Sequence, residues 1–257
     1  MLKTILTLSE TKTIGIDDPD LIRKRFEIIK SKQFLKKIYL EWYDQILGLI
    51  PDGPGKILEI GSGGGFLKEI LPEVITSEVL KIPGIRLDLT IDACKSIPFC
   101  HNELKAIVMV DVLHHLPDVA TFFKIASKCI KKGGRIIMLE PWFTPWSGFI
   151  YRNLHHEAFD TSSQHWSFKS SGPLSGANGA LPWIIFHRDL FKFKQEFPCY
   201  EIFEIRKTMP FSYLFSGGVS CKTLLPGCLF SIIRSVERGL KFESMCAMFA
   251  YITLQKL

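Results

Sequence analysis

A short apolar run followed by a glycine-rich turn, residues 57–66, constrains the fold of this chain more than any other stretch. The apolar residues 57–60 have the character of a buried strand. The glycines that follow permit a tight turn with positive φ and let the backbone approach a ligand without an intervening Cβ atom. Residues 66–71 then predict a helix that ends at Pro72. A strand, a glycine turn and a helix together present backbone N–H groups to a nucleotide-like ligand.

The spacing of the glycines separates two classes of ligand. A dinucleotide fingerprint, G-x-G-x-x-G, requires a third glycine at the position of Phe66. The chain instead has an acid, one residue and then G-x-G-x-G, beginning at Glu59. This pattern resembles the first motif of the class I S-adenosylmethionine-dependent methyltransferases. The resemblance implies that the cofactor is S-adenosylmethionine and that the turn binds its methionyl part through Glu59, Gly61, Ser62, Gly63 and Gly65.

Acidic residues follow the next three predicted strands. Residues 74–78 predict a strand that ends in Glu78, whose carboxylate can accept both ribose hydroxyl hydrogens; a surface glutamate is the alternative interpretation. A strand at 87–91 ends at Asp92-Ala93, where methyltransferases of this class place an acid that accepts from the adenine amino group. The apolar run 106–110 predicts a central strand covered on both faces, and it ends at Asp111. By resemblance, Asp92, Ala93 and Asp111 are further cofactor-binding residues.

The next segment supports the same resemblance. Residues 117–132 predict a helix with Lys131 and Lys132 in its last turn, ended by Gly133-Gly134. A fifth strand, 135–140, leads to Glu140-Pro141. These motifs stand over residues 57–141 in the order typical of small-molecule methyltransferases of this class.

The predicted fold is α/β: a Rossmann-like, seven-stranded, mostly parallel sheet with helices on both faces, an antiparallel edge hairpin and cap insertions. The hairpin is assigned to residues 200–207 and 248–255. One domain, 1–257, then comprises a helical segment 1–50, a cofactor-binding core 51–141, a cap or lid 142–186 and a C-terminal part 187–257 that contains a second insertion, 209–245. The cap assignment rests on the low periodicity of a segment too long for an ordinary connection.

The helical segment begins with a lead-in, 1–17, and a helix start at Asp18-Pro19-Asp20. The helix is expected to reach Ile50, with a break near Ser31. Trp42 and Tyr43 are predicted to be core residues rather than ligand contacts.

His115 is the first candidate for a catalytic base, because it leaves the fourth strand on the cofactor side. A histidine that packs or caps the next helix is the alternative, and His114 and Glu140 are weaker candidates. Residues 155–165 contain three histidines and two acids, but their spacing matches no known zinc motif, so no metal is expected.

The composition limits the partners. Net charge is only +6, and the basic cluster at 23–37 is read as a solvated helix face rather than a nucleic-acid site. Seven cysteines without a C-x-x-C pair indicate reduced thiols and a cytoplasmic protein. No signal-peptide core and no apolar run of spanning length stands in the sequence. A weak peripheral membrane contact through the apolar-basic stretch 224–240 stays open.

We therefore expect methyl transfer by in-line displacement to a small acceptor, and the aromatic content of the cap favours an apolar or aromatic one. The methylated atom, oxygen, carbon or nitrogen, is left open. The first alternative is a methyltransferase-like module without catalysis that binds a membrane surface or a partner protein. The second is an NAD(P)-dependent reductase, against which Phe66 and the lack of a Tyr-x-x-x-Lys pair count.

Overall fold

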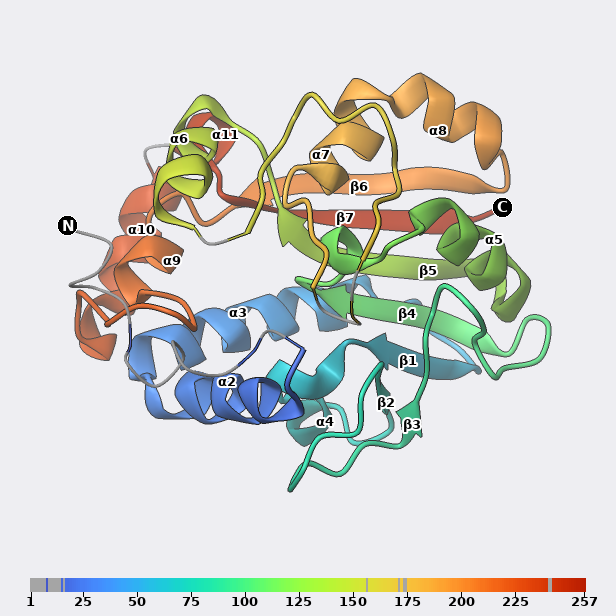
Figure 1. Cartoon of the computed structure of the whole chain (residues 1–257), viewed down its shortest axis with the longest axis horizontal. Helices are drawn as coiled ribbons and strands as arrows, with labels where there is room; N and C mark the ends of the chain where they lie inside the picture. The colour runs from blue at the N-terminus through green and yellow to red at the C-terminus, as the bar shows by residue number, and fades with distance from the viewer. Residues whose placement is uncertain are drawn as a thin grey trace.

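A single seven-stranded sheet forms the centre of the molecule, with strand order β3-β2-β1-β4-β5-β7-β6 (Figure 1). The computed structural model describes residues 8, 15, 17–155, 157–170, 172, 175–239 and 242–257, so most of the predicted lead-in 1–17 lies outside the described residues. The strands are β1 Lys56–Ile60, β2 Ile75–Glu78, β3 Leu89–Thr90, β4 Leu104–Val110, β5 Ile130–Pro141, β6 Tyr200–Thr208 and β7 Phe249–Lys256. Strands β1 to β5 pair in parallel, and β7 runs antiparallel to both β5 and β6. The predicted sheet with its antiparallel edge is confirmed.

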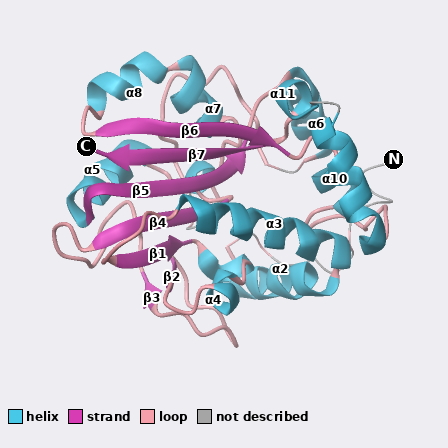
Figure 2. Cartoon of the chain, turned by 180° about the vertical axis from the view of Figure 1, so that it is seen from behind, coloured by secondary structure: helices cyan, strands magenta, loops and turns pink. Residues whose placement is uncertain are grey.

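Helices cover both faces of this sheet. The helices are α2 Pro19–Ser31, α3 Gln33–Leu49, α4 Leu67–Ile70, α5 Val119–Cys129, α6 Pro145–Leu154, α7 Leu181–Trp183, α8 Leu190–Glu196, α9 Ser212–Ser216, α10 Phe230–Gly239 and α11 Phe242–Cys246. Viewed from opposite sides, Figures 1 and 2 place α5 on one face of the sheet and α3 on the other. Phe193 of α8 packs against Phe123 of α5, with ring centroids 5.4 Å apart, so these two helices share a face. Among the described residues, no helix has both the length and the apolar character needed to cross a membrane.

The N-terminal helices form as the sequence predicts. The Asp18 carboxylate accepts from the Asp20 N–H at 2.9 Å and caps α2, which ends at Ser31 where the break was expected. In α3, Trp42 is buried and packs against Phe249 of β7 at a centroid distance of 5.2 Å, which confirms it as a core residue. This contact fixes α3 across the sheet beside the glycine turn.

Three predicted boundaries are wrong. The helix expected to continue through Lys132 ends at Cys129, because Ile130 is buried and pairs with Leu104 as the first residue of β5. Residues 131–134 stand opposite the single residue Lys105, where the register shifts, and Gly133 takes a φ of 73° there. The K-x-G-G stretch therefore forms an enlarged bulge within a strand rather than a helix stop. The strand expected at 87–91 is shorter and consists only of β3, Leu89–Thr90, and the helix expected at 66–71 consists only of α4, Leu67–Ile70.

The segment predicted as a cap or lid, 142–186, contains regular structure. Helix α6 begins with a capping box in which Thr144 and Ser147 exchange side-chain and backbone hydrogen bonds. The chain then crosses η3, the 3₁₀ turn Leu113–His115, and the Asn178 N–H donates to the His114 carbonyl at 3.1 Å. The segment is thus fastened directly over the end of β4. It continues through α7 into the π-helical turn η4, Ile184–Arg188.

The second insertion carries α9, the turn η5 (Gly227–Leu229), α10 and α11. Arg234 of α10 is buried and pairs with Glu41 of α3 at 2.7 Å and with Glu237, whose carboxylate also accepts from the Ser212 N–H at 2.7 Å. Ile232 and Val236 on the same helix are exposed, and they are the surface that a membrane contact through 224–240 would use.

Candidate active site

The carboxyl ends of β1, β2, β4 and β5 meet at one edge of the sheet, where a cavity opens. In an α/β sheet of this order, β1 and β4 flank the switch point at which ligands bind. The cavity has a volume of about 140 Å³, against roughly 10–15 Å³ for a single buried water on the same scale. Six residues predicted for the site line it: Glu59, Gly61, Gly65, Glu78, Asp111 and His115.

The backbone of the glycine turn packs so closely against neighbouring side chains that three of its positions have no room for a Cβ atom. Gly61 has a φ of 72°, and a Cβ atom there would overlap Val112. A Cβ at Gly65 would overlap the hydroxyl of Tyr43, and one at Gly63 would overlap Ile82. Side chains at these three positions would therefore displace the walls of the cavity.

Two buried carboxyl groups face each other across this turn. Glu78 accepts from the Val79 N–H at 2.8 Å and from the Gly63 N–H at 3.3 Å, and burial raises the pKa of its carboxyl. Burial also raises the pKa of Glu59 to about 7, with the neighbouring Glu78 charge adding to the effect. A ligand that offers hydroxyl or ammonium donors here would stabilise both carboxylates.

Four predicted cofactor residues lie outside the lining of the cavity, and their roles stay predictions. Ser62 is buried behind the turn, where its hydroxyl donates to the Glu59 carbonyl at 3.2 Å. The N–H of Gly63 points to Glu78. Asp92 accepts from the Cys94 N–H at 3.0 Å, and Ala93 is buried beside it.

Sequence reasoning missed several cavity residues: Arg25, Tyr39, Tyr43, His155, Glu157 and Tyr213. Tyr43 is buried as predicted, but it also faces the cavity, and its hydroxyl accepts from the Phe66 N–H at 2.9 Å. These residues come from helices and insertions whose position on the sheet is set by tertiary packing. The apolar stripe of α3 indicated a core face, the basic cluster 23–37 was interpreted as a solvated face, and the run 155–165 was considered only as a metal motif.

Two adjacent histidines, His114 and His115, follow β4, and the buried carboxylate of Glu140 contacts the first of them. His114 is fully buried, and its Nδ1 lies 2.8 Å from Oε2 of Glu140, which is also fully buried. The other oxygen of Glu140 accepts from the N–H groups of Val112 and Leu113 at 2.9 and 2.7 Å. Burial alone would lower the pKa of His114, but its contacts with Glu140 and Glu157 raise that pKa well above the ordinary value. Glu140 thus orients the turn and lies away from the cavity.

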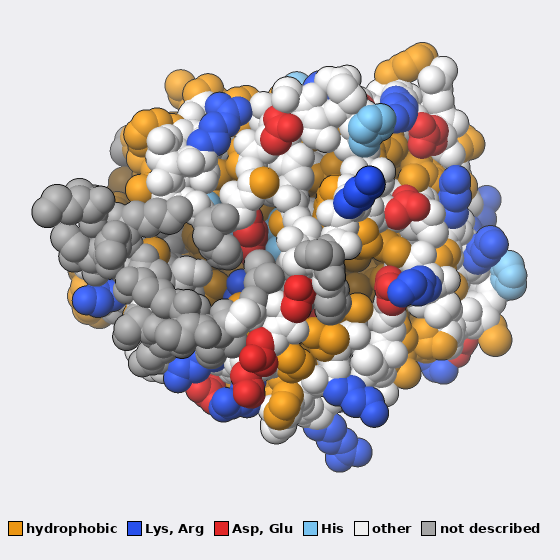
Figure 3. Space-filling model, viewed as in Figure 1, with side chains coloured by type: hydrophobic (Ala, Val, Ile, Leu, Met, Phe, Trp, Pro, Cys, Tyr) orange, Lys and Arg blue, Asp and Glu red, His pale blue; other side chains and the backbone are white. Residues whose placement is uncertain are grey.

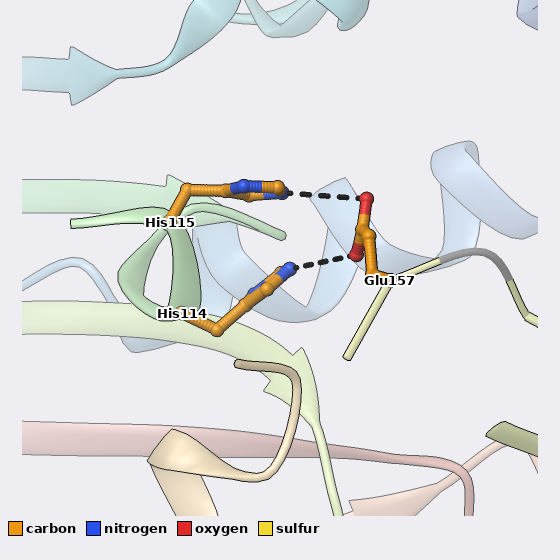
Figure 4. Close-up of side chains that lie close together, drawn as sticks. All are labelled: His114, His115 and Glu157. Atoms are coloured by element: carbon orange, nitrogen blue, oxygen red, sulfur yellow. Dashed lines mark ion pairs between the residues drawn. The ribbon is translucent and has the colours of Figure 1, made fainter. Parts of the chain in front are cut away.

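His115 and Glu157 complete this polar corner (Figure 4). The Nε2 atoms of His114 and His115 lie 3.4 and 3.7 Å from the two carboxylate oxygens of Glu157. His155 places its Nδ1 3.8 Å from the same carboxylate. Burial and, to a smaller extent, the nearby His114 lower the pKa of His115 to about 3, so its imidazole is neutral at pH 7. His156 of the same run lies outside the described residues, and Asp160 and His165 are exposed.

The sheet order, the glycine turn and the acids around it have the arrangement in which open α/β folds bind nucleotide-like ligands at the carboxyl edge of the sheet. Residues 32–174 match the model of the methyltransferase domain family, so the chain belongs to that family. It is a methyltransferase, and this family implies S-adenosylmethionine as the cofactor. The cavity fits this cofactor, because the glycine cradle is free of Cβ atoms and the Glu78 carboxylate lies in its wall.

Solved structures share the fold. An S-adenosylmethionine-dependent methyltransferase from Thermotoga maritima, described as a possible histamine N-methyltransferase, is 18% identical with a TM-score of 0.54 over 92% of this chain and 99% of that one. The geranyl diphosphate C-methyltransferase from Streptomyces coelicolor A3(2), solved with Mg²⁺, geranyl diphosphate and S-adenosylhomocysteine, is 10% identical with a TM-score of 0.52 over 98% of this chain and 89% of that one. None of the curated proteins compared matches the chain.

Proposed function

We propose that this protein transfers the methyl group of S-adenosylmethionine to a small acceptor that binds between the end of β4 and the segment 142–186. The observation that carries the proposal is that three polar side chains, His115, His155 and Glu157, line the same cavity as the glycine turn. A nucleophilic group held there would lie beside the cofactor. The bound cofactor supplies a methyl group on a sulfonium, which leaves by in-line displacement.

The chain's own residues would position the cofactor first. We assign the methionyl part to the turn that contains Glu59, Gly61 and Gly65, and the ribose hydroxyls to Glu78. Asp111 lines the cavity in a left-handed conformation, with a φ of 63°, which a non-glycine residue adopts only at some cost. Such strain is common where a site fixes a side chain, and it supports a functional role for Asp111.

The acceptor side combines polar and apolar walls. A smaller adjoining cavity shares Asp111, His155 and Glu157 with the first one and adds Tyr151, Phe159 and Phe249. This lining supports an acceptor that presents a polar nucleophile to His115 and buries a compact apolar or aromatic part. His115 is the proposed catalytic residue, because its neutral imidazole offers a lone pair at the point where the acceptor must be activated.

Other features are consistent with a small-molecule enzyme in the cytoplasm. All seven cysteines are free thiols. On the face in Figure 3, basic and acidic side chains are interspersed over the described surface, which favours no polyanionic partner.

The test is to incubate the purified protein with methyl-labelled S-adenosylmethionine and a deproteinised metabolite extract. Label is expected in small organic products, and His115→Ala should lower the transfer roughly 100-fold or more while S-adenosylhomocysteine binding is unchanged. Label in macromolecules instead would contradict the acceptor class. Binding of S-adenosylhomocysteine without any transfer would favour the non-catalytic alternative.

A further inference from the structure

Three lone-pair donors converge at the edge of the cavity, although they come from two distant parts of the chain. His114 and His115 stand on η3, and Glu157 follows α6. One atom of each, Nε2 of both histidines and a carboxylate oxygen, lies within 4.8 Å of the others. Figure 4 shows both rings directed at Glu157 from the same side.

Both rings are held by a hydrogen bond at the opposite nitrogen. Nδ1 of His114 lies 2.8 Å from the buried Glu140 carboxylate, and Nδ1 of His115 lies 3.4 Å from the Gly176 carbonyl. A carboxylate or carbonyl on the far nitrogen is the arrangement that fixes the tautomer of metal-binding histidines. Each Nε2 is thereby presented to the cavity edge.

The hydrogen bonding of the His114 ring is unusual at Nε2. Its Nε2 is completely buried and forms an ion pair with Glu157, but it makes no hydrogen bond of regular geometry among the described residues, which is uncommon for a polar atom at such depth. It points toward Glu157, whose nearest oxygen is 3.4 Å away. Two ligands of a tetrahedral ion with bonds of about 2.0–2.2 Å are themselves roughly 3.4 Å apart.

We propose that His114, His115 and Glu157 bind a divalent transition-metal ion of the zinc class. Two imidazoles and one carboxylate are a donor set that zinc enzymes use when they keep a fourth position open. Imidazole nitrogen favours zinc or its transition-metal neighbours over magnesium and calcium. Besides Glu157, the Asp111 carboxylate lies 4.0 Å from Nε2 of His114, which favours a dication there, and the ion would take the place of a proton on this nitrogen.

The role of the ion, though not its binding, rests on the proposed methyl transfer. Because His115 and Glu157 both line the cavity, a hydroxyl of the acceptor could take the fourth position of the ion from that side. With the ion bound, Nε2 of His115 would be a ligand rather than a base, and the ion would lower the pKa of that hydroxyl, whose proton passes to solvent. The acceptor oxygen then forms a bond to the methyl carbon as the carbon–sulfur bond breaks, and S-adenosylhomocysteine leaves. The sequence-based expectation of no metal considered only residues 155–165, and local spacing does not reveal a site built with η3.

The test measures metal and cofactor binding separately on the full chain. The protein is stripped with a chelator, titrated with Zn²⁺ in a calorimeter, and loaded with Co²⁺, whose visible absorption reports low-symmetry coordination. About one ion per chain is expected, with affinity falling at least ~100-fold in His115→Ala and in Glu157→Gln, and ~10–100-fold in Glu140→Gln. His101→Ala/His165→Ala, which changes two exposed histidines outside the cluster, is the matched control and should bind as the wild type does.

Thermal stabilisation by S-adenosylhomocysteine verifies that each variant is folded. If the wild type binds this ligand but takes up no Zn²⁺ or Co²⁺, the metal site is refuted and the cluster is a histidine–carboxylate network. Equal uptake by the wild type and the Glu157→Gln variant would also refute it, because the ion would then lie elsewhere. If the wild type does not bind S-adenosylhomocysteine, this result would instead count against the proposed function.

Discussion

The most informative substitution is Glu78→Gln, because it should separate cofactor binding from stability. Glu78 lies in the cavity wall with 8% of its surface exposed, and its two oxygens accept from the backbone of Val79 and Gly63. Glutamine has nearly the same shape and keeps an oxygen for the shorter contact, 2.8 Å to the Val79 N–H. It removes the negative charge that we assign to the ribose hydroxyls.

A hydrogen bond to a charged group contributes about 1.5–3 kcal/mol, so the dissociation constant for S-adenosylhomocysteine should rise roughly 10–150-fold. Stability should behave differently. Burial raises the pKa of Glu78, which means that the buried charge itself is costly. The free energy of unfolding should therefore change by less than about 1 kcal/mol in Glu78→Gln, whereas Glu78→Ala, which leaves two N–H groups without an acceptor, should lose about 1–3 kcal/mol.

Calorimetric titration with S-adenosylhomocysteine gives the first quantity, and urea unfolding of the ligand-free protein gives the second. Glu73→Gln, an exposed change on the turn before β2, is the control and should alter neither. A dissociation constant for Glu78→Gln within about twofold of the wild type would refute the ribose assignment, since a charge-assisted contact cannot be lost so cheaply.

Three further predictions concern the fold and the turn. Gly61→Ala should lower the free energy of unfolding by more than about 1 kcal/mol and weaken cofactor binding. The reason is that Gly61 has a positive φ and that a new Cβ would overlap Val112. Unchanged denaturation and binding curves would contradict this prediction. Glu59, whose folded pKa is about 7 against about 4.5 unfolded, favours the ligand-free fold fully below pH 4.5, and this contribution is lost as the pH rises through 7. Between pH 5 and 8 the free energy of unfolding, measured in urea, should fall by about 2.5 kcal/mol less in Glu59→Gln than in the wild type, and the remaining fall comes from other buried acids such as Asp111; an equal fall in both proteins would refute the assignment. Arg234→Met should lower the free energy of unfolding by roughly 3–5 kcal/mol, because it leaves buried carboxylates unpaired. Lys192→Met, which breaks an exposed ion pair, should lower it by less than about 1 kcal/mol, and equal losses in urea unfolding would contradict the reasoning.

The sequence was most informative where one residue type is required by local geometry. The glycine turn could be predicted because only glycine combines the φ of 72° at position 61 with a backbone packed against Val112. Glu78 and Asp111 could be placed because acids at strand ends come to the same edge of a parallel sheet. The seven-stranded, mostly parallel sheet with its antiparallel edge hairpin followed from the family resemblance rather than from periodicity.

Other features depend on contacts that local sequence does not encode. The end of α5 was misplaced because Lys131 to Gly134 have the chemistry of a helix end, whereas the pairing of Ile130 with Leu104 decides the boundary. The approach of Glu157 to His115 could not be predicted, since it depends on how the segment after α6 folds back over η3. Tyr43 shows a third case: the apolar stripe of α3 correctly indicated that this residue is buried, but not that it also lines the cavity.

The central claim is that the cavity at the glycine turn binds S-adenosylmethionine. Thermal unfolding with S-adenosylmethionine, S-adenosylhomocysteine, NADH and NADPH in parallel tests it directly. A ligand at about 100 times its dissociation constant adds about 2.7 kcal/mol, which corresponds to a rise of roughly 5–10 °C for a domain of this size. We predict this rise with the two sulfur-containing ligands, its loss in Gly61→Ala, and no rise with either nicotinamide. A rise with a nicotinamide alone, or with none of the four, would contradict the account.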